Sequence, residues 1–241
     1  YRTSRIKVLL RKHKGYSANY WTADITIKDP SQMFSALSYG TYGGTRETTS
    51  HAVSRTRSIV GINASAFSYD SGRPCFDAVK IQNGKIYNRA GGTSYSNCAV
   101  LWDGTMFTPQ VHLSAEQLVD MGVKDTYNFG PPLIENGKKV NYNMANSANS
   151  WTLVSYKDPR SAVGMISKGH YVLLVADGRG AGGSLGLTRS DMQQIFAGFG
   201  CVYAYNMDGG GSATLAYRGT VLNNPSDGSE RACGDFLLFK E

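Results

Sequence analysis

The chain has 241 residues, enough for one large domain with a full hydrophobic core, and no Pro-rich, Ser-rich or charged linker divides it. We therefore predict a single domain over residues 1–241. No window approaches 18 consecutive apolar residues, so no membrane-spanning helix is predicted. The 11% aromatic residues, 28 glycines and 18% charged residues favour a loop-rich, β-containing exported protein. We expect it to be secreted or at the cell surface, with any signal peptide removed or trimmed from this sequence.

The net charge of +7 is concentrated at the beginning of the chain. Six basic side chains and no acidic one fall within the first fourteen residues, namely Arg2, Arg5, Lys7, Arg11, Lys12 and Lys14. A basic arm of this kind suits an anionic polymer such as nucleic acid or a phosphate-bearing wall glycan. However, the apolar residues Ile6, Val8 and Leu10 alternate with Lys7 and Arg11, and residues 21–27 alternate in the same way. This pattern predicts a β-hairpin over residues 1–28 with a solvated basic edge, and we expect no nucleic-acid partner.

Short strands and few helices are predicted for the middle of the chain. The segment 29–32, Asp-Pro-Ser-Gln, has the cap and first-turn proline of a helix start, followed by Met33, Phe34 and Leu37 as an apolar face. The apolar run 59–62 indicates a buried strand ending at Asn63. Four further strands are predicted over 78–82, 85–88, 98–102 and 106–108, with turns at 83–84 and 103–104. A helix is predicted over 114–121, and a turn over 135–137.

In the last third, two strands deliver acidic residues. The segments 161–167 and 171–176 predict a hairpin whose second strand leads into Asp177. Thr188 caps a predicted helix that ends at Gly200, and the following strand leads to Asp208. If the two acid-bearing strands are parallel neighbours, Asp177 and Asp208 converge at one sheet edge. The overall prediction is an α+β fold with a mixed β-sheet core and a few short helices.

The segment 206–214, Asn-Met-Asp-Gly-Gly-Gly-Ser-Ala-Thr, is the most informative motif. It places Asp208 at the foot of three glycines between two predicted strands. One Asp-Gly pair is enough for a turn, so the extra glycines indicate close approach of another backbone segment or of a ligand. Glycine also leaves backbone N–H groups accessible to an anion or a sugar.

The four cysteines, Cys75, Cys98, Cys201 and Cys233, are widely spaced and lack the paired spacing of a zinc site. Their even number is consistent with two disulfides. We favour Cys75 with Cys98 and Cys201 with Cys233, because these pairings close local loops. Four buried free thiols are the alternative.

Several motifs together resemble the phosphodiester glycosidase family. They are 158–164 (DPRSAVG, similar to NPRTAIG), 177–179 (DGR), 206–214 (similar to NLDGGGSST), 62–67 (INASAF, similar to INGGFF), 130–133 (GPPL) and 230–235 (similar to ER-x-x-x-D). The order and spacing also agree, and the resemblance spans nearly the whole chain. Two glycines of the family pattern are replaced here by Ala64 and Ser65, which would place Cβ atoms beside the presumed pocket.

The resemblance implies an active glycosidase with a polar site assembled from these motifs. We predict Asp208, Asp177 and Arg160 as catalytic residues. The predicted substrate-binding residues are Asn63, Arg179, Gly209, Gly210, Ser212, Arg231 and Asp235. The implied substrate is a glycosyl phosphate, with N-acetylglucosamine-1-phosphate type linkages as one form, in a glycan, exopolysaccharide or teichoic-acid-like wall polymer.

The chemistry of such a substrate agrees with these residue types. A sugar 1-phosphodiester has a leaving group that departs as a stable phosphate anion, so charge neutralisation matters more than a general acid. Arginine can bind the phosphate in fork geometry, while Asp208 or Asp177 stabilises an oxocarbenium-like centre or activates water. Which acid is base or nucleophile is left open at this point, as is C–O against P–O cleavage.

No cofactor is expected to be required, although the Asp and Asn residues leave calcium or magnesium open. His13, His51, His112 and His170 have no metal-ligand spacing, which argues against zinc or a Ser-His-Asp arrangement. The alternatives to a glycosidase are a P–O cleaving phosphodiesterase and a non-catalytic glycan- or wall-binding module. In the latter, Trp21, Trp102 and Trp151 would stack on sugars.

Overall fold

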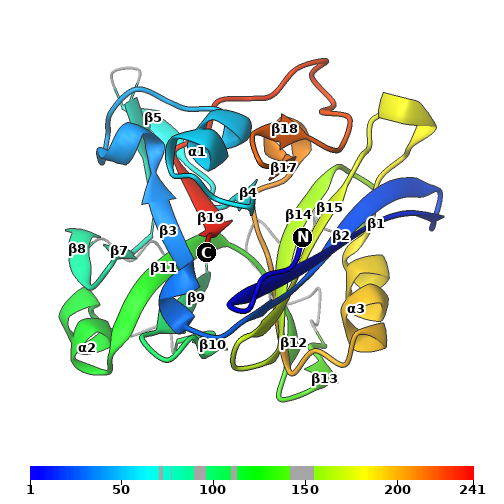
Figure 1. Ribbon diagram of the computed structural model, residues 1–241. Helices are drawn as coiled ribbons and strands as arrows, with labels where there is room; N and C mark the ends of the chain where they lie inside the picture. Colours follow the sequence, from blue (N-terminus) through cyan, green and yellow to red (C-terminus); the bar gives the residue numbers. More distant parts are fainter. Residues whose placement is uncertain (71–72, 77, 90–95, 110–112, 142–154) are drawn as a thin grey trace.

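Two β-sheets form the centre of the computed structural model (Figure 1). The structure describes residues 1–70, 73–76, 78–89, 96–109, 113–141 and 155–241. The larger sheet has the order β1-β2-β15-β14-β16-β12-β13. Its strands are β1 (Ile6–Gly15), β2 (Ala18–Ile27), β12 (Pro132–Glu135), β13 (Lys138–Lys139), β14 (Arg160–Ser167), β15 (His170–Ala176) and β16 (Tyr203–Asn206).

The second sheet has the order β18-β17-β4-β19-β3. Its strands are β3 (Met33–Leu37), β4 (Val60–Asn63), β17 (Leu215–Tyr217), β18 (Thr220–Val221) and β19 (Asp235–Phe239). A smaller three-stranded sheet contains β9 (Ser96–Leu101), β10 (Met106–Phe107) and β11 (Val123–Phe129). Two hairpins complete the strands: β5 (Ser68–Asp70) with β6 (Arg73–Cys75), and β7 (Lys80–Gln82) with β8 (Lys85–Asn88).

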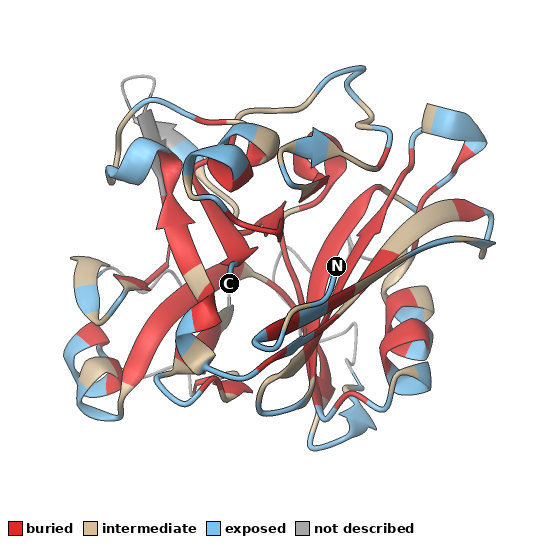
Figure 2. Ribbon diagram, in the orientation of Figure 1, coloured by how far each residue is buried: buried red, intermediate tan, exposed pale blue. Residues whose placement is uncertain are grey.

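The main hydrophobic core lies between the two large sheets. It joins residues of the first sheet, such as Ile25 and Leu173, to residues of the second, such as Ile62 and Leu237, all of them fully buried. Figure 2 shows the strands of both sheets mostly in the buried colour, while much of the β1–β2 hairpin is less buried. Burial of these facing side chains from water is the main force that holds the sheets together.

Three α-helices occur among the described residues. Helix α3 (Arg189–Gly198) packs on the outer face of the first sheet, and α1 (Thr49–Arg55) on the outer face of the second (Figure 1). Helix α2 (Ala115–Asp120) covers the three-stranded sheet. Ser114 and Thr188 cap α2 and α3 with the side-chain hydrogen bonds that the sequence predicted. No helix in the described part of the chain is long and apolar enough to cross a membrane.

The predicted α+β class with a few short helices is confirmed. The hairpin of β1 and β2, the hairpin of β14 and β15 and the strands of the middle region also form as predicted. The strand pairings within the described sheets are antiparallel, which refines the expected mixed sheet.

The helix predicted after Pro30 is wrong. Asp29 accepts a hydrogen bond from the Ser31 amide at 2.8 Å, and Gln32 completes the capping box, but only one 3₁₀ turn follows. Met33 then begins β3, which pairs with β19. One turn is enough to satisfy the cap, whereas the next five residues gain backbone partners and burial by joining the sheet. Pairing with a distant strand therefore outweighs the local helix signal.

The predicted disulfides are also wrong. Cys98, Cys201 and Cys233 are free thiols, and all three are buried. They lie in three different parts of the core: Cys98 between the sheets, Cys201 under α3 and Cys233 beside α1. Because each packs as a small apolar side chain within its own cluster, neither predicted pairing forms. The free thiols also remove disulfides as support for an oxidising compartment.

Candidate active site

The two strands that lead to Asp177 and Asp208 end at the same edge of the first sheet. They are β15 and β16, which run parallel to each other but are separated by the antiparallel strand β14. Strand β14 starts at this edge with Arg160, which pairs with Ala176. The two acid-bearing strands are thus not neighbours as expected, but one strand of opposite direction places an arginine between their ends.

The loop from 207 to 214 crosses from this edge to β17 of the second sheet, and a pocket of about 400 Å³ opens beside it. The lining residues are Phe129, Tyr156, Lys157, Asp158, Arg160, Arg179, Asp208, Gly209, Gly210 and Arg231. The structure therefore brings together six of the ten site residues predicted from the sequence. The lining carries four cationic side chains against two acidic ones, so the pocket favours an anionic ligand.

Each of the three consecutive glycines is closely approached by another group. A Cβ at Gly209 would lie 2.6 Å from the Pro159 carbonyl oxygen, and one at Gly210 would lie 2.9 Å from Nη2 of Arg179. A Cβ at Gly211 would lie 2.2 Å from Nη2 of Arg231. Gly210 also has a φ of +58°, which disfavours other residues. The glycines thus let two guanidinium groups and a backbone segment pack directly on the loop.

The loop's backbone is largely committed to the protein rather than to an incoming anion. The Gly210 amide donates to Pro159 at 2.9 Å, and the Ser212 amide donates to Gly209 at 3.1 Å. The sequence left open whether the glycines serve a backbone contact or a ligand. The structure accounts for all three by contacts within the chain.

Asp208 is the distinctive acid of the pocket. Its side chain is partly buried, and burial raises the pKa of this carboxyl to about 6, although the nearby Ser212 hydroxyl and Arg231 oppose the rise. It forms no ion pair with any residue in the described ranges. The Ser212 Oγ is buried beside it without a well-formed hydrogen bond within the described part of the chain. An acid near half-ionisation at pH 6, with a hydroxyl beside it, is suited to chemistry or binding.

Asn63 holds the Asp208 loop from beneath rather than lining the pocket. Its Nδ2 donates to the Asp208 carbonyl at 2.6 Å, and its Oδ1 accepts from the Thr214 amide at 3.1 Å. The Asp208 amide in turn donates to the Ala64 carbonyl at 2.8 Å. The end of β4 therefore fixes both ends of the crossover loop, and with them the position of the Asp208 side chain.

The three arginines of the pocket differ in their surroundings. Arg160 is only 2% exposed and donates to the carbonyls of Leu187 and Tyr156 at 3.0 and 2.7 Å. Burial lowers its pKa to about 10, which leaves it charged at neutral pH. Arg179 and Arg231 are partly exposed, and each is oriented by an aspartate. Their partners are Asp158, bound through two hydrogen bonds of 2.8 and 3.1 Å, and Asp227.

Asp177 lies outside the pocket lining. It is buried, and both of its carboxyl oxygens accept hydrogen bonds from Asn224, one from the amide at 2.7 Å and one from Nδ2 at 2.8 Å. Its position at the end of β15 is as predicted, but its side chain anchors the segment around Asn224. The structure thus does not bring Asp177 into the site with Asp208.

Asp235 also lies outside the pocket lining, in a buried ion pair with Lys80. Its two carboxyl oxygens accept from the amide and the hydroxyl of Ser65, both at 2.7 Å. Ser65 and Ala64 are buried and do not line the pocket. The Cβ atoms that replace the two glycines of the family pattern therefore point into the protein. The expectation that they stand beside the pocket is wrong.

Sequence reasoning missed four residues that line the pocket: Phe129, Tyr156, Lys157 and Asp158. Tyr156 is 70% exposed, an unusual position for a tyrosine without a ligand. Asp158 belongs to a motif that the sequence singled out. Its ion-pair partner is Arg179, which lies 21 residues later in the chain and was not predicted to contact it. These residues come from separate segments of the chain, and only the folded structure brings them to one pocket.

No group of three or more His, Cys, Asp or Glu side chains within the described ranges is arranged to hold a metal ion. His51 and His170 contact Glu47 and Asp24 at 2.6 and 2.7 Å. His112 and Trp151, singled out by the sequence, lie outside the described residues.

The fold and the pocket define a class of antiparallel α+β proteins in which an aspartate of a crossover loop, here Asp208, lies among arginines. The comparison with protein families identifies this class more closely. The family model described as phosphodiester glycosidase matches residues 56–240. The chain therefore belongs to the phosphodiester glycosidase family.

Relatives in sequence and structure agree with this assignment. An uncharacterized SPbeta prophage-derived protein, YomE, of Bacillus subtilis (strain 168) is 36% identical over 204 residues, which cover 82% of this chain and 30% of that protein. The N-acetylglucosamine-1-phosphodiester alpha-N-acetylglucosaminidase of Mus musculus is 28% identical over 83% of this chain and 40% of its own length. The chain thus spans less than half of these relatives.

The zebrafish enzyme of the same name has a solved catalytic domain, auto-inhibited by its pro-peptide. It superposes with a TM-score of 0.76 at 20% identity, covering 98% of this chain and 83% of that one. A hypothetical protein from Synechocystis gives a TM-score of 0.71 at 15% identity, over 99% of this chain and 63% of that one. These likenesses show a shared fold.

Proposed function

We propose that this chain hydrolyses a sugar 1-phosphodiester by cleaving the bond between the anomeric carbon and oxygen, which releases free sugar. The observation that supports the proposal most directly is the pocket itself. One carboxyl with a pKa of about 6 stands among the guanidinium groups of Arg160, Arg179 and Arg231. An anionic leaving group and a developing positive centre need this combination of charges.

The arginines are proposed to hold the phosphodiester and to neutralise the charge that it gains as the bond breaks. Arg179 and Arg231 are oriented by Asp158 and Asp227, so their guanidinium planes are fixed before substrate arrives. Because the group that departs is a phosphate monoester, a stable anion, no protonated acid is needed to assist it. One ionised carboxylate is then sufficient for the chemistry.

Asp208 is proposed as that carboxylate. Asp158, the other acid of the pocket, is held by two hydrogen bonds from Arg179, whereas Asp208 makes no ion pair within the described ranges. It acts either as the base that removes a proton from the attacking water or as the nucleophile at the anomeric carbon. Ser212, predicted to bind substrate, is buried outside the pocket lining, and its hydroxyl is proposed to orient the Asp208 carboxyl instead.

The sugar is proposed to be of the N-acetylglucosamine type, because the mouse and zebrafish relatives carry that substrate in their names. Tyr156 at the mouth of the pocket offers an exposed aromatic surface for a sugar ring. A glycan or wall polymer outside the cell is the proposed natural substrate. No cofactor is proposed.

The test is release of free sugar from a small panel of sugar 1-phosphodiesters, with sugar 1-phosphates as controls. We expect release of sugar by the parent and none by the Asp208→Asn variant. Reaction in water enriched in oxygen-18 places the label in the sugar for C–O cleavage and in the phosphate for P–O cleavage. The configuration of the released sugar separates the two roles of Asp208, since retention indicates a nucleophile and inversion a base. Turnover by Asp208→Asn at the parent rate would refute its proposed role.

A further inference from the structure

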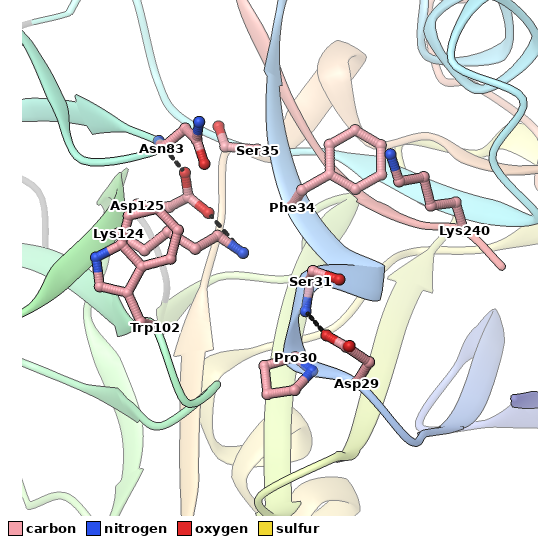
Figure 3. Close-up of a pocket in the computed structure, with 10 residues that line it drawn as sticks. All are labelled: Asp29, Pro30, Ser31, Phe34, Ser35, Asn83, Trp102, Lys124, Asp125 and Lys240. Atoms are coloured by element: carbon pink, nitrogen blue, oxygen red, sulfur yellow. Dashed lines mark hydrogen bonds and ion pairs between the residues drawn. The ribbon is translucent and has the colours of Figure 1, made fainter.

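A second pocket lies at a different place in the fold. It has a volume of about 500 Å³ and is shown in Figure 3. Its lining residues are Asp29, Pro30, Ser31, Phe34, Ser35, Asn83, Trp102, Lys124, Asp125 and Lys240. None of them lines the Asp208 pocket. It is therefore a separate cavity, between the three-stranded sheet and β3.

Trp102 forms an aromatic wall of this pocket. The residue follows β9, and its side chain is 54% exposed although it is the largest apolar type. A Cβ at Gly84 would lie 3.2 Å from Cζ2 of the indole, so the ring packs directly against the Asn83–Gly84 turn. The glycine holds the ring in place without covering it. An exposed but supported aromatic ring of this kind is suited to stacking on a flat apolar surface.

Polar groups lie beside the ring and across the pocket from it. In Figure 3, Lys124 and Asp125 lie on the side of Trp102, while Ser31 and Phe34 lie on the β3 side. Asp125 and Lys124 are more than nine-tenths buried, and their side chains are 3.5 Å apart. Asp125 also accepts from the Asn83 amide at 2.9 Å, and Lys124 donates to the Met33 carbonyl at 2.6 Å. Both groups are thus fixed by the protein.

The charges of this pocket balance, in contrast to those of the Asp208 pocket. Asp29 and Asp125 are matched by Lys124 and Lys240, and the ammonium of Lys240 lies 4.8 Å from the centre of the Phe34 ring. A balanced lining does not favour an anion over a neutral molecule. The pocket offers both acceptors and donors beside an aromatic face. Hydroxyl groups around a ring with an apolar C–H face match that combination.

We propose that this pocket is a second, non-catalytic site that binds a neutral sugar ring of a glycan, stacked on Trp102 and hydrogen-bonded to Asp125 and Lys124. Its occupant is uncharged, whereas the Asp208 pocket takes the phosphodiester. Binding here would hold a glycan on the protein independently of the reaction. The proposal therefore stands or fails separately from the hydrolytic function.

The experiment is calorimetric titration of the Asp208→Asn variant, which would not consume the ligand. The probes are the tetramer of N-acetylglucosamine and cellotetraose as neutral glycans, with a glycerol phosphate oligomer as the anionic comparison. We expect a neutral tetramer to bind. Adding Trp102→Ala should weaken binding about tenfold or more, and Trp102→Phe should restore most of it, because a stacking ring is retained.

Tyr39→Ala is the matched control, since Tyr39 is 51% exposed and lies outside both pockets. It should leave the affinity unchanged, and thermal unfolding checks that each variant is folded. The proposal is overturned if neither neutral tetramer binds, if only the glycerol phosphate oligomer binds, or if Trp102→Ala leaves the affinity for neutral tetramers unchanged. If the parent did not hydrolyse sugar 1-phosphodiesters, the proposed function would be contradicted, but glycan binding at the Trp102 pocket would not be affected.

Discussion

Replacing Asp208 by Asn should abolish turnover and at the same time stabilise the folded protein at neutral and alkaline pH. The substitution keeps the size of the side chain and removes its charge. Burial raises the pKa of Asp208 from 3.8 to about 6, which means that the folded protein favours the neutral form. An amide is always neutral, so the variant avoids the cost of a buried charge.

The size of the effect follows from the shift in pKa. Each pKa unit corresponds to about 1.4 kcal/mol between the two protonation states, so a rise from 3.8 to about 6 corresponds to about 3 kcal/mol. Water reaches part of this carboxyl, which makes about 3 kcal/mol an upper bound. Between these pH values the folded state binds more protons than the unfolded state. Stability from Asp208 is therefore present below about pH 4 and lost as the pH rises through about 6.

Urea unfolding of parent and variant at pH 4, 5, 6 and 8 measures this directly. The free energy of unfolding of Asp208→Asn, relative to the parent, should increase with pH by up to about 3 kcal/mol and level off above about pH 6. Asp120→Asn, on the exposed end of α2, is the control and should run parallel to the parent. A constant difference between parent and Asp208→Asn from pH 4 to 8 would refute the raised pKa assigned to this partly buried carboxyl.

Three further predictions concern the rest of the pocket. Arg231→Lys should lower kcat/KM by about 10²–10³-fold, because an ammonium cannot keep both the contact with Asp227 and a planar fork for phosphate, and steady-state kinetics on a sugar 1-phosphodiester measures this. Activity equal to the parent would count against a phosphate contact. Gly210→Ala should destabilise the folded protein by about 1–2 kcal/mol, because Gly210 has a left-handed φ and the new Cβ would contact Arg179. Gly198→Ala in α3, where a Cβ meets nothing within 4 Å, is the control and should be neutral or stabilising. Thermal unfolding measures both. Equal effects of the two would contradict the packing argument. Treatment with EDTA should leave kcat/KM within about twofold, as guanidinium groups supply the positive charge; loss of activity that calcium or magnesium restores would contradict this.

The sequence predicted the elements that carry the site better than the contacts within it. Hairpin β14–β15, the capped helix α3 and the strand before Asp208 follow from local pattern and capping, which need only neighbouring residues. These elements depend on short-range physics, and for that reason the sequence was sufficient for them. The edge that places Arg160 between the two acid-bearing strands was not predicted, because the chain runs from β15 through α3 to β16 and leaves β14 between them.

The contacts that were missed depend on residues far apart in the chain. The helix predicted at Met33 gave way to a strand because β19, some two hundred residues later, supplies its backbone partners. Asp177 and Asp208 look alike in sequence, each following a strand and preceding glycine. Only the folded structure shows that Asn224 occupies the carboxyl of Asp177, while Asp208 remains in the pocket.

Asp235 lies outside the pocket, and we propose that its charge influences Asp208. Substitution of Asp235 can separate this electrostatic effect from a purely structural role. Its charge lies close enough to contribute to the raised pKa of Asp208, and Lys80 partly balances it. Asp235→Asn leaves the Lys80 charge without its partner, so the pKa of Asp208 should fall and the acid limb of the kcat/KM profile should move to lower pH. Lys80→Met leaves Asp235 uncompensated and should move that limb to higher pH.

Both single variants break a buried ion pair and should lose about 3–5 kcal/mol of stability, so the profiles are measured at low temperature with folding checked by circular dichroism. The acid limb could shift in opposite directions in the two variants although both lose similar stability. That result would show that the charges of Asp235 and Lys80 change the pKa of Asp208 electrostatically. Shifts in the same direction, or none, would leave Asp235 as a structural anchor alone. The position of the acid limb therefore separates electrostatic tuning from simple support of the loop.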